Sequence, residues 1–193
     1  AALFTSAAQG WNNFAQVGRG TSYGLELLYE GSLPQYRTSW EASYTWSKSD
    51  RAFSNINSGN PFPAKFDRPH ICNASVHWGN LTVSFTYQSG HNETVPAGQY
   101  AGYLPSGNRM LDYFDHPDNW RMPAYVRFDA GYSIDFHSSL KDGRQLDHHF
   151  TFGVFNLLNR HNASMLVYDQ NEKSWYFVSL FPVMPNIRYS LKF

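Results

Sequence analysis

Hydrophobic and polar residues alternate along much of this chain. In the longest run, from Val126 to Phe136, every second residue is apolar, and the residues between them include Arg127 and Asp129. Successive side chains of a β-strand point to opposite faces, so this alternation predicts a strand with one apolar and one polar face. With two less regular strands included, the chain has seven strands, at about 18–31, 36–50, 69–79, 81–89, 125–136, 147–158 and 186–193. No segment follows a helical period.

The connections between these strands alternate between short and long. Short turns are expected at residues 32–35, at Gly79-Asn80 and around 141–144, whereas long connections are expected at about 50–69, 90–124 and 159–185. Outer-membrane barrels show this alternation, with tight turns at one rim and long loops at the other. The predicted strands, of roughly 9–14 residues, also suit a tilted strand that crosses a bilayer, and they exceed the roughly 5–6 residues usual in soluble proteins.

Composition strengthens this interpretation. Aromatic residues make up 18% of the chain, whereas charged residues make up only 16%, below the roughly 25% usual in soluble domains. Several apolar faces carry an aromatic residue at or near one end, namely Trp40, Trp46, Trp78, Tyr87, Phe136, Tyr189 and Phe193. Aromatic rings at both interfaces are typical of outer-membrane barrels. The sequence therefore predicts an all-β fold made of antiparallel transmembrane β-barrel strands.

Two other folds fit parts of the pattern. A soluble, aromatic-rich β-sandwich that acts as a binding module would bury the face carrying Phe128, Tyr132 and Phe136, whereas a membrane barrel would leave that face bare. A small closed outer-membrane barrel of eight strands would need one more strand, near residues 163–181.

Charge and reactive side chains argue against several functions. The formal net charge is zero, with 15 basic and 15 acidic residues, so the chain has no electrostatic footprint for nucleic acid. No Ser-His-Asp or paired-carboxylate spacing indicates an enzyme. One segment carries an oxygen-rich group of side chains, Asp112, Asp115, His116 and Asp118. Their spacing is not that of a calcium-binding loop. We therefore expect no catalytic residue, no metal site and no cofactor.

Seven strands do not close a barrel by themselves. Every backbone N–H and C=O needs a partner inside lipid, and two open edges would leave a row of them unpaired. Single-chain bacterial barrels accordingly have even numbers of strands. We therefore expect residues 1–193 to be the C-terminal section of a larger barrel, with residues 1–10 as the tail of an earlier loop.

Segments along nearly the whole chain resemble, in order, the C-terminal third of a TonB-dependent outer-membrane receptor of the Bacteroidota type. These segments are Gly18 to Leu27, Ala42 to Ser49, Phe53 to His70, Ser89-Gly90, Pro96 to Tyr100, Arg121 to Asp129, Val154 to Arg160 and Leu180 to Pro185. The resemblance implies a barrel of about 22 strands in the bacterial outer membrane, in contact with the lipid bilayer. It also implies uptake of a scarce nutrient, energised by the TonB complex, with no covalent chemistry.

The same resemblance sets expectations about ligand and partners. The ligand would be an iron chelate, a vitamin, an oligosaccharide or a peptide, and a surface lipoprotein is a candidate partner. The plug domain and the segment that engages TonB are expected to lie outside these 193 residues.

Two sets of residues are candidates for function. Long loops with aromatic and Arg side chains commonly bind ligands, so the segment 90–124 is the expected ligand surface. Its candidate residues are Tyr100, Tyr103, Arg109, Tyr113, Trp120 and Arg121. The end of the chain resembles the C-terminal signal that the outer-membrane assembly machinery recognises. The residues of that signal are Ile187, Tyr189, Leu191 and Phe193.

Overall fold

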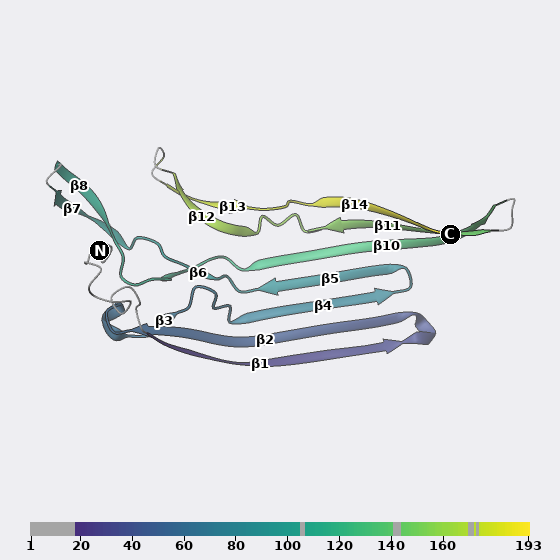
Figure 1. Ribbon diagram of the computed structural model, residues 1–193, viewed down its shortest axis with the longest axis horizontal. Coiled ribbons are helices and arrows are strands. Elements are labelled where there is room, and N and C mark those ends of the chain that lie inside the picture. The colour runs from purple at the N-terminus through teal and green to yellow at the C-terminus, as the bar shows by residue number, and fades with distance from the viewer. Residues whose placement is uncertain (1–17, 105–106, 141–143, 170–171, 173) are drawn as a thin grey trace, which may run out of the picture. The chain divides into compact units, whose positions relative to one another are not determined.

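The structure, a computed structural model, describes residues 18–104, 107–140, 144–169, 172 and 174–193. Apart from two single-turn 3-10 helices, η2 (Pro34–Tyr36) and η3 (Asn57–Gly59), the regular structure in these residues consists of β-strands (Figure 1). The strands are β1 (Gly18–Leu33), β2 (Thr38–Phe53), β3 (Phe62–Pro63), β4 (His70–Trp78), β5 (Leu81–Gln88), β6 (Asn92–Glu93), β7 (Gly98–Leu104), β8 (Gly107–Tyr113), β9 (Trp120–Arg121), β10 (Tyr125–Ser139), β11 (Gln145–Phe155), β12 (Ala163–Asp169), β13 (Ser174–Ser179) and β14 (Met184–Lys192). No helix in the described part of the chain is long and apolar enough to cross a membrane.

The chain divides into two compact units. The first, called the loop unit below, comprises Ala1–Gly24, Ser47–Asp67 and His91–Met122. The second, called the strand unit, comprises Leu25–Trp46, Arg68–Gly90 and Pro123–Phe193. The strands β1 and β2 contribute residues to both units.

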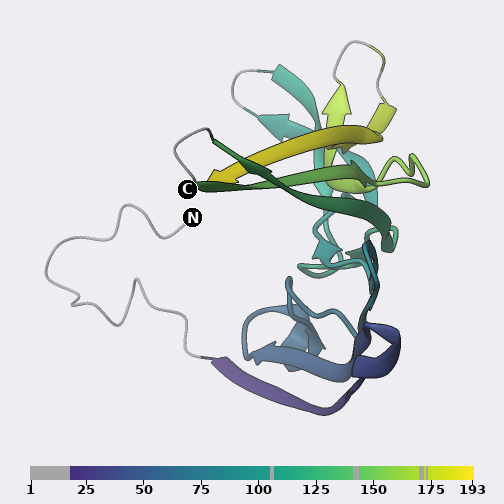
Figure 2. The same ribbon diagram turned by 90° about the vertical axis from the view of Figure 1, so that its right-hand side faces the viewer.

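One antiparallel sheet dominates the strand unit. Its strands follow the order β1-β2-β4-β5-β10-β11-β14, and β3 pairs separately with β2. These seven strands are the seven that the alternating pattern predicts, with bounds that agree within about three residues. Neighbouring strands of this sheet lie side by side in the strand unit (Figure 2). The predicted all-β, antiparallel fold is therefore confirmed.

The register of this sheet brings like residues together across five strands, from β2 to β11. One apolar row runs from Trp40 in β2 through Val76, Val83 and Ala130 to Val154 in β11, each the direct partner of the next. Because partners in an antiparallel pair point to the same side, the apolar halves of all these strands form one continuous face. A shift of one residue in any strand would move its apolar set to the polar side.

The opposite face of the sheet is polar in the same regular way. Glu41 pairs with Ser75, Ser75 with Ser84, and Ser84 with Asp129. Further along the sheet, Thr151 lies between Ser133 and Arg188. The sheet therefore has one apolar face and one polar face.

The apolar face is bare within the described residues. Tyr132 is 49% exposed, Trp78 64% and Ile187 71%. A soluble sandwich would bury this face under a second sheet, which does not occur here. The expectation of an exposed apolar face is met, and the sandwich alternative is not favoured.

The short turns also follow the prediction. Gly79 and Asn80 connect β4 to β5, whose partners Trp78 and Leu81 flank them directly. Gly79 has φ +59°, the left-handed value that glycine adopts without strain and that a type II′ hairpin turn needs at its first central position. Most of the expected turn at 141–144 lies outside the described residues, which resume at Arg144.

The long connections differ from the sequence prediction because they contain strands. The segment 90–124 holds the pairs β6–β9 and β7–β8, and the segment 159–185 holds the pair β12–β13. The strands near 163–181 pair with each other and do not join the main sheet. An eighth barrel strand is therefore not found there, and the sheet is not closed among the residues described.

Candidate functional site

The loop unit is held together by a clasp between Asp67 and Arg121. The Arg121 Nη2 atom donates to Asp67 Oδ2 at 2.7 Å, and its Nη1 donates to the carbonyl of the same residue at 2.9 Å. The second carboxylate oxygen of Asp67 accepts from the backbone N–H of Ser49 at 2.8 Å. Asp67 is only 5% exposed, so its carboxylate is buried, whereas the Arg121 side chain is 36% exposed. The clasp joins three segments that are distant in sequence.

A small core surrounds this clasp. Phe62, Ala64 and Met122 are each at most 4% exposed. Asn92, 2% exposed, donates from Nδ2 to the carbonyl of Ala64 at 2.9 Å, and its backbone N–H donates to the carbonyl of Lys65 at 2.9 Å. Buried polar groups need such partners because an unmatched one costs about 1–3 kcal/mol. Polar contacts, more than apolar burial, therefore order this part of the molecule.

The neighbouring turn, residues 115–119, contains two carboxylates with opposite behaviour. Asn119 donates to Asp115 at 2.6 Å and His116 N donates to it at 2.8 Å, and these hydrogen bonds lower the pKa of Asp115. Burial raises the pKa of Asp118, whose backbone N–H donates to Thr94 Oγ1 at 2.9 Å. Among the described residues, no group of three or more His, Cys, Asp or Glu side chains has the arrangement of a metal site.

The six candidate ligand residues have different positions. Tyr100 and Tyr113 lie on the same face of the β7–β8 hairpin, because Tyr100 pairs with Leu111 two residues before Tyr113, and both are more than half exposed. Tyr103 and Arg109 lie in the same two strands, but their side chains are outside the described part of the structure. Trp120 is half-buried beside Arg121 in β9, and Arg121 forms the clasp to Asp67. Tyr100 and Tyr113 are therefore the two side chains in this set that the structure shows exposed on a common face.

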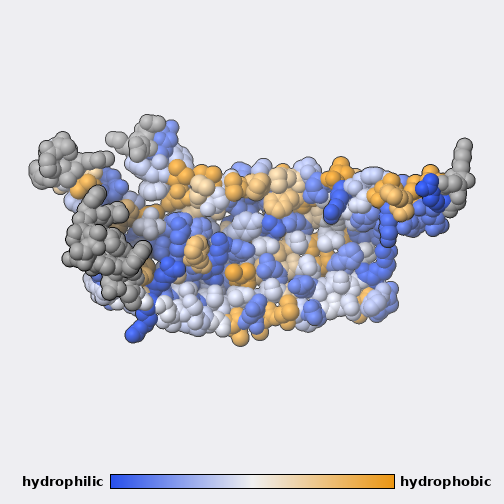
Figure 3. All heavy atoms as spheres, in the orientation of Figure 1, coloured by the Kyte–Doolittle hydropathy of each residue, from blue (hydrophilic) through white to orange (hydrophobic). Residues whose placement is uncertain are grey.

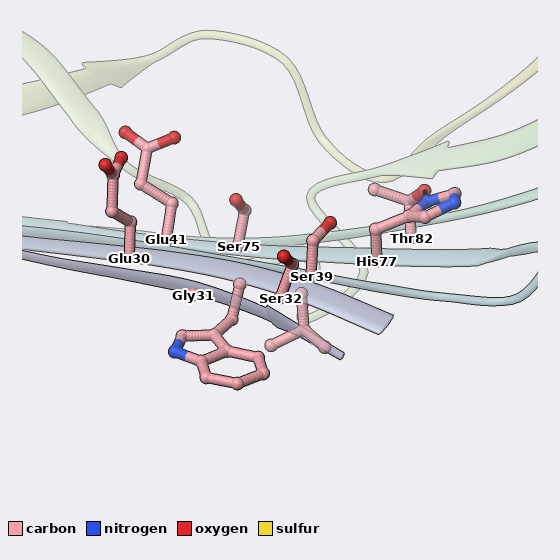
Figure 4. Close-up of a pocket in the computed structure, with 10 residues that line it drawn as sticks. Glu30, Gly31, Ser32, Ser39, Glu41, Ser75, His77 and Thr82 are labelled. Atoms are coloured by element: carbon pink, nitrogen blue, oxygen red, sulfur yellow. Dashed lines mark hydrogen bonds between the residues drawn. The ribbon is translucent and has the colours of Figure 1, made fainter. Parts of the chain in front are cut away.

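The polar face of the sheet holds a concavity of about 470 Å³ near the β1–β2 turn. Figure 4 shows Glu30 and Glu41 on the same side of the sheet, together with Ser75 and His77. A Cβ on Gly31 would lie 2.4 Å from Trp40, which indicates that these two residues are cross-strand neighbours and that Glu30 lies opposite Glu41. Neither carboxylate forms an ion pair within the described residues. This part of the polar face is therefore acidic and open to solvent.

The polar face also contains a cluster of hydrogen bonds, called the asparagine cluster below, where β10, β11 and β14 begin or end. Asp129 forms an ion pair with Arg127 at 2.9 Å and accepts from the backbone N–H of Asn156 at 2.8 Å. Asn156 is 1% exposed, and its Nδ2 donates to the carbonyls of Arg160 and Phe181, each at 3.0 Å. Asn156 has φ +54°, a left-handed conformation that Asn tolerates better than most residues.

A second asparagine, Asn162, completes this asparagine cluster. Asn162 accepts from Val126 N at 2.9 Å and donates to Val126 O at 2.8 Å, so one side chain replaces a strand partner at the start of β10. No periodicity or motif in the sequence gives a role to Asp67, Asn92, Asn156 or Asn162. Asn and Asp in a long connection are ordinarily taken as turn residues, and only their partners in three dimensions show that they are buried.

The four residues of the expected C-terminal signal alternate along the end of the chain. Ile187, Tyr189 and Leu191 pair with Phe152, Phe150 and His148 of β11, all on the apolar face. The Tyr189 hydroxyl hydrogen-bonds to His148 Nδ1 at 2.8 Å. Phe193 follows β14 and is 91% exposed. All four are therefore accessible at the sheet's apolar surface.

The fold and this two-sided sheet define a class of protein, the β-barrels of the outer membrane, whose strands have one lipid-facing and one lumen-facing side. Residues 2–157 match the family described as TonB dependent receptor-like, beta-barrel. No curated protein and no solved structure shows significant similarity to the chain. Because the match covers most of its length, the chain belongs to the TonB-dependent receptor β-barrel family. That family consists of outer-membrane receptors and transporters and is not a family of enzymes.

Proposed function

We propose that the chain forms part of the wall of a larger outer-membrane barrel that imports a scarce nutrient with energy supplied through TonB. The observation that carries this proposal is the continuous, exposed apolar face that register builds across the sheet, backed by a polar face. The free edges of β1 and β14 support a larger barrel, because among the described residues each of these strands pairs on one side only.

The ligand surface that we propose includes the β7–β8 hairpin. Tyr100 and Tyr113 offer two exposed rings on one face, and rings of this kind bind by stacking at little cost in conformational entropy. The ligand classes consistent with the family resemblance are an iron chelate, a vitamin, an oligosaccharide and a peptide.

Uptake by cells that carry the intact receptor tests this function. The probes are a ferric catecholate, cobalamin, a labelled maltooligosaccharide and a labelled tripeptide. We expect one probe to accumulate in cells with functional TonB and not in cells without it. Accumulation that is equal with and without TonB, or absent for all four classes, would contradict the proposal.

The hairpin has its own test with a matched control. Replacing Tyr100 and Tyr113 by Ala removes both rings, and we expect binding of the accumulated probe to weaken by about tenfold or more, because each aromatic contact contributes about 0.5–1.5 kcal/mol. Met110 is 57% exposed and lies on the other face of the hairpin, so Met110→Ala should leave binding unchanged.

We also propose that β14 and Phe193 are recognised by the outer-membrane assembly machinery. The alternating, exposed side chains of Ile187, Tyr189 and Leu191 support this role, since a recognition partner can reach them along one face. Deletion of Phe193 should reduce the amount of folded protein in outer membranes, whereas Lys192→Ala on the polar face should not.

A further inference from the structure

The β12–β13 hairpin does not have the two-sided character of the main sheet. On one of its faces Val167 pairs with Tyr176, and Met165 pairs with Val178. On the other face Tyr168 pairs with Trp175. In the main sheet each strand has a polar side, but both sides of this hairpin carry apolar or aromatic side chains.

These side chains are exposed on both faces. Met165 is 49% exposed and Val167 42% on the first face, and Tyr168 is 39% and Trp175 45% on the second. The rings of Tyr168 and Trp175 lie 5.1 Å apart at 50°, so each ring covers only part of the other. A two-stranded ribbon cannot cover its own faces, and exposed apolar surface of this kind marks a contact with another phase or partner.

The asparagine cluster fixes the base of the hairpin. Asn156 donates to Phe181 O at 3.0 Å, and Asn159 accepts from Val183 N at 3.0 Å. Asn162, immediately before β12, is tied to both backbone groups of Val126. The apolar hairpin is therefore held in a defined position at the end of β11 and β14.

The exposed apolar surface of the sheet continues toward this hairpin. Leu157 and Leu158 follow β11 and are 46% and 58% exposed, and Phe181 and Val183 precede β14 and are 57% and 41% exposed. Figure 3 shows hydrophobic residues gathered along β14 and the segment that leads to it. The hairpin belongs to the same compact unit as β11 and β14 and lies between them in the chain.

We propose that the β12–β13 hairpin rests in the headgroup layer of the outer leaflet, beside the lipid-facing surface of β11 and β14. This inference rests on the proposed outer-membrane function. A lipid interface surrounds the hairpin and covers both faces at once, whereas a docked protein ordinarily covers one. The hairpin's outer edges lack strand partners among the described residues, which excludes the hydrocarbon core but not the hydrated headgroup layer. Tyr and Trp are enriched at that depth.

Site-directed fluorescence in vesicles tests the proposal. The intact receptor, with Cys72→Ser, carries a single new cysteine at Val167 or at Trp175, on opposite faces of the hairpin, labelled with an environment-sensitive fluorophore. Ile134→Cys on the apolar face of β10 and Ser75→Cys on the polar face of β4 are the controls. The vesicles contain phosphatidylcholine and phosphatidylglycerol, with a nitroxide either on the headgroup or deep in the acyl chain.

We expect both hairpin labels to lose most of their emission with the headgroup nitroxide and little with the deep one. The Ile134 label should lose more with the deep nitroxide, and the Ser75 label should be quenched by neither. Quenching at Ile134 without quenching at the hairpin overturns this proposal and leaves the membrane function intact. No quenching at Ile134 contradicts the membrane function itself.

A partner protein gives a different result. If only one hairpin label is quenched, or if both are shielded from labelling reagent in outer membranes without lipid quenching, a protein covers the hairpin and the lipid proposal fails. Folding of each variant is checked by its heat-modifiable mobility on gels. Should either variant not fold, Met165→Cys and Tyr168→Cys place labels on the same two faces.

Discussion

The strand unit and the loop unit place their side chains in opposite ways. In the strand unit, apolar side chains such as Tyr132 and Ile187 lie at the surface, 49% and 71% exposed. In the loop unit, the polar side chains of Asp67 and Asn92 are buried, at 5% and 2% exposure. The contrast follows from the surroundings: the outer face of a barrel is covered by lipid, whereas the loops must supply their own partners.

This contrast separates two sources of stability. The strand unit depends on its register and on what surrounds its exposed apolar face, so the effect of a substitution depends on which face it occupies. The loop unit depends on a few polar contacts between distant segments, so the effect of a substitution depends on the identity of its partner.

The largest expected effect comes from a charge on the lipid-facing side of the sheet. Tyr132→Arg places a guanidinium near the middle of the apolar face of β10, and we expect the free energy of unfolding in vesicles to fall by about 2–4 kcal/mol. Ser133→Arg, one residue further and on the polar face, should change it much less. Urea titration of both variants in the same vesicles makes the comparison. Equal losses would mean that both faces meet the same environment.

The second prediction concerns a part of the strand unit that is built like the loop unit. Asn156→Ala removes the donor to Arg160 O and Phe181 O and puts a less tolerant residue at φ +54°. We expect a loss of about 2–3 kcal/mol in the free energy of unfolding.

Two further variants in the same asparagine cluster identify the cause of that loss. Asn156→Gly keeps the backbone conformation and loses the hydrogen bonds, so the difference between the Gly and Ala variants measures strain. Asn159→Ala meets similar backbone strain, at φ +47°, but lies at an exposed position with one such contact, to Val183 N, so it should lose less, about 1–2 kcal/mol. A loss at Asn159 as large as that at Asn156 would show that burial does not set the cost.

The sequence predicted the strand unit well because the information there is local. Alternation from Val126 to Phe136 assigns both faces of β10, and Gly79-Asn80 marks the turn between β4 and β5 without reference to any other part of the chain. The strands inside the long connections were not predicted. The β12–β13 hairpin is apolar on both faces, so it has no period-2 signal.

The loop unit was predicted less well because its contacts are distant in sequence. Arg121 was expected at the ligand surface from its residue type, and its partner Asp67 lies 54 positions earlier, a relation that no period shows. A ligand role for Arg121 stays a prediction, now for a side chain already bound to Asp67. Tyr100 and Tyr113 were candidate ligand residues because they are aromatic side chains in a long connection. That they share one face depends on the register of β7 and β8, which the sequence pattern does not show.

The third prediction tests whether the clasp controls the loop unit independently of the strand unit. Asp67→Asn keeps the shape of the side chain and removes the charge that Arg121 contacts at 2.7 Å. We expect the free energy that protects the loop amides from exchange to fall by about 1–2 kcal/mol. This loss is smaller than for a fully buried ion pair, because the Arg121 side chain is 36% exposed. Amide hydrogen exchange at Ala64 and Met122 measures this.

Lys65→Ala is the matched control for the clasp. It removes an ion pair with Glu93 in the same unit, between side chains that are 45% and 26% exposed. Surface pairs of this kind contribute about 0–1 kcal/mol, so loop protection should barely change. Loss of protection in β10 and β11 together with the loops in Asp67→Asn would show that the two units open as one.

The smallest expected effect is the pH response of the turn at residues 115–119. The pKa of Asp115 is lowered by its hydrogen bonds from Asn119 and His116, so its stabilisation is present above the unfolded pKa and is lost as the pH falls through the folded one. The pKa of Asp118 is raised by burial, so the stabilisation from its protonated form is present below the unfolded pKa and is lost as the pH rises through the folded one. Carbon-13 NMR titration of the Asp carboxyls, assigned with Asp115→Asn and Asp118→Asn, should place the two midpoints on opposite sides of the ordinary Asp value. Two midpoints on the same side would mean that the turn is not folded around Asp115 as the loop unit's polar contacts require, and that the buried polar order seen at Asp67 does not extend to this end of the unit.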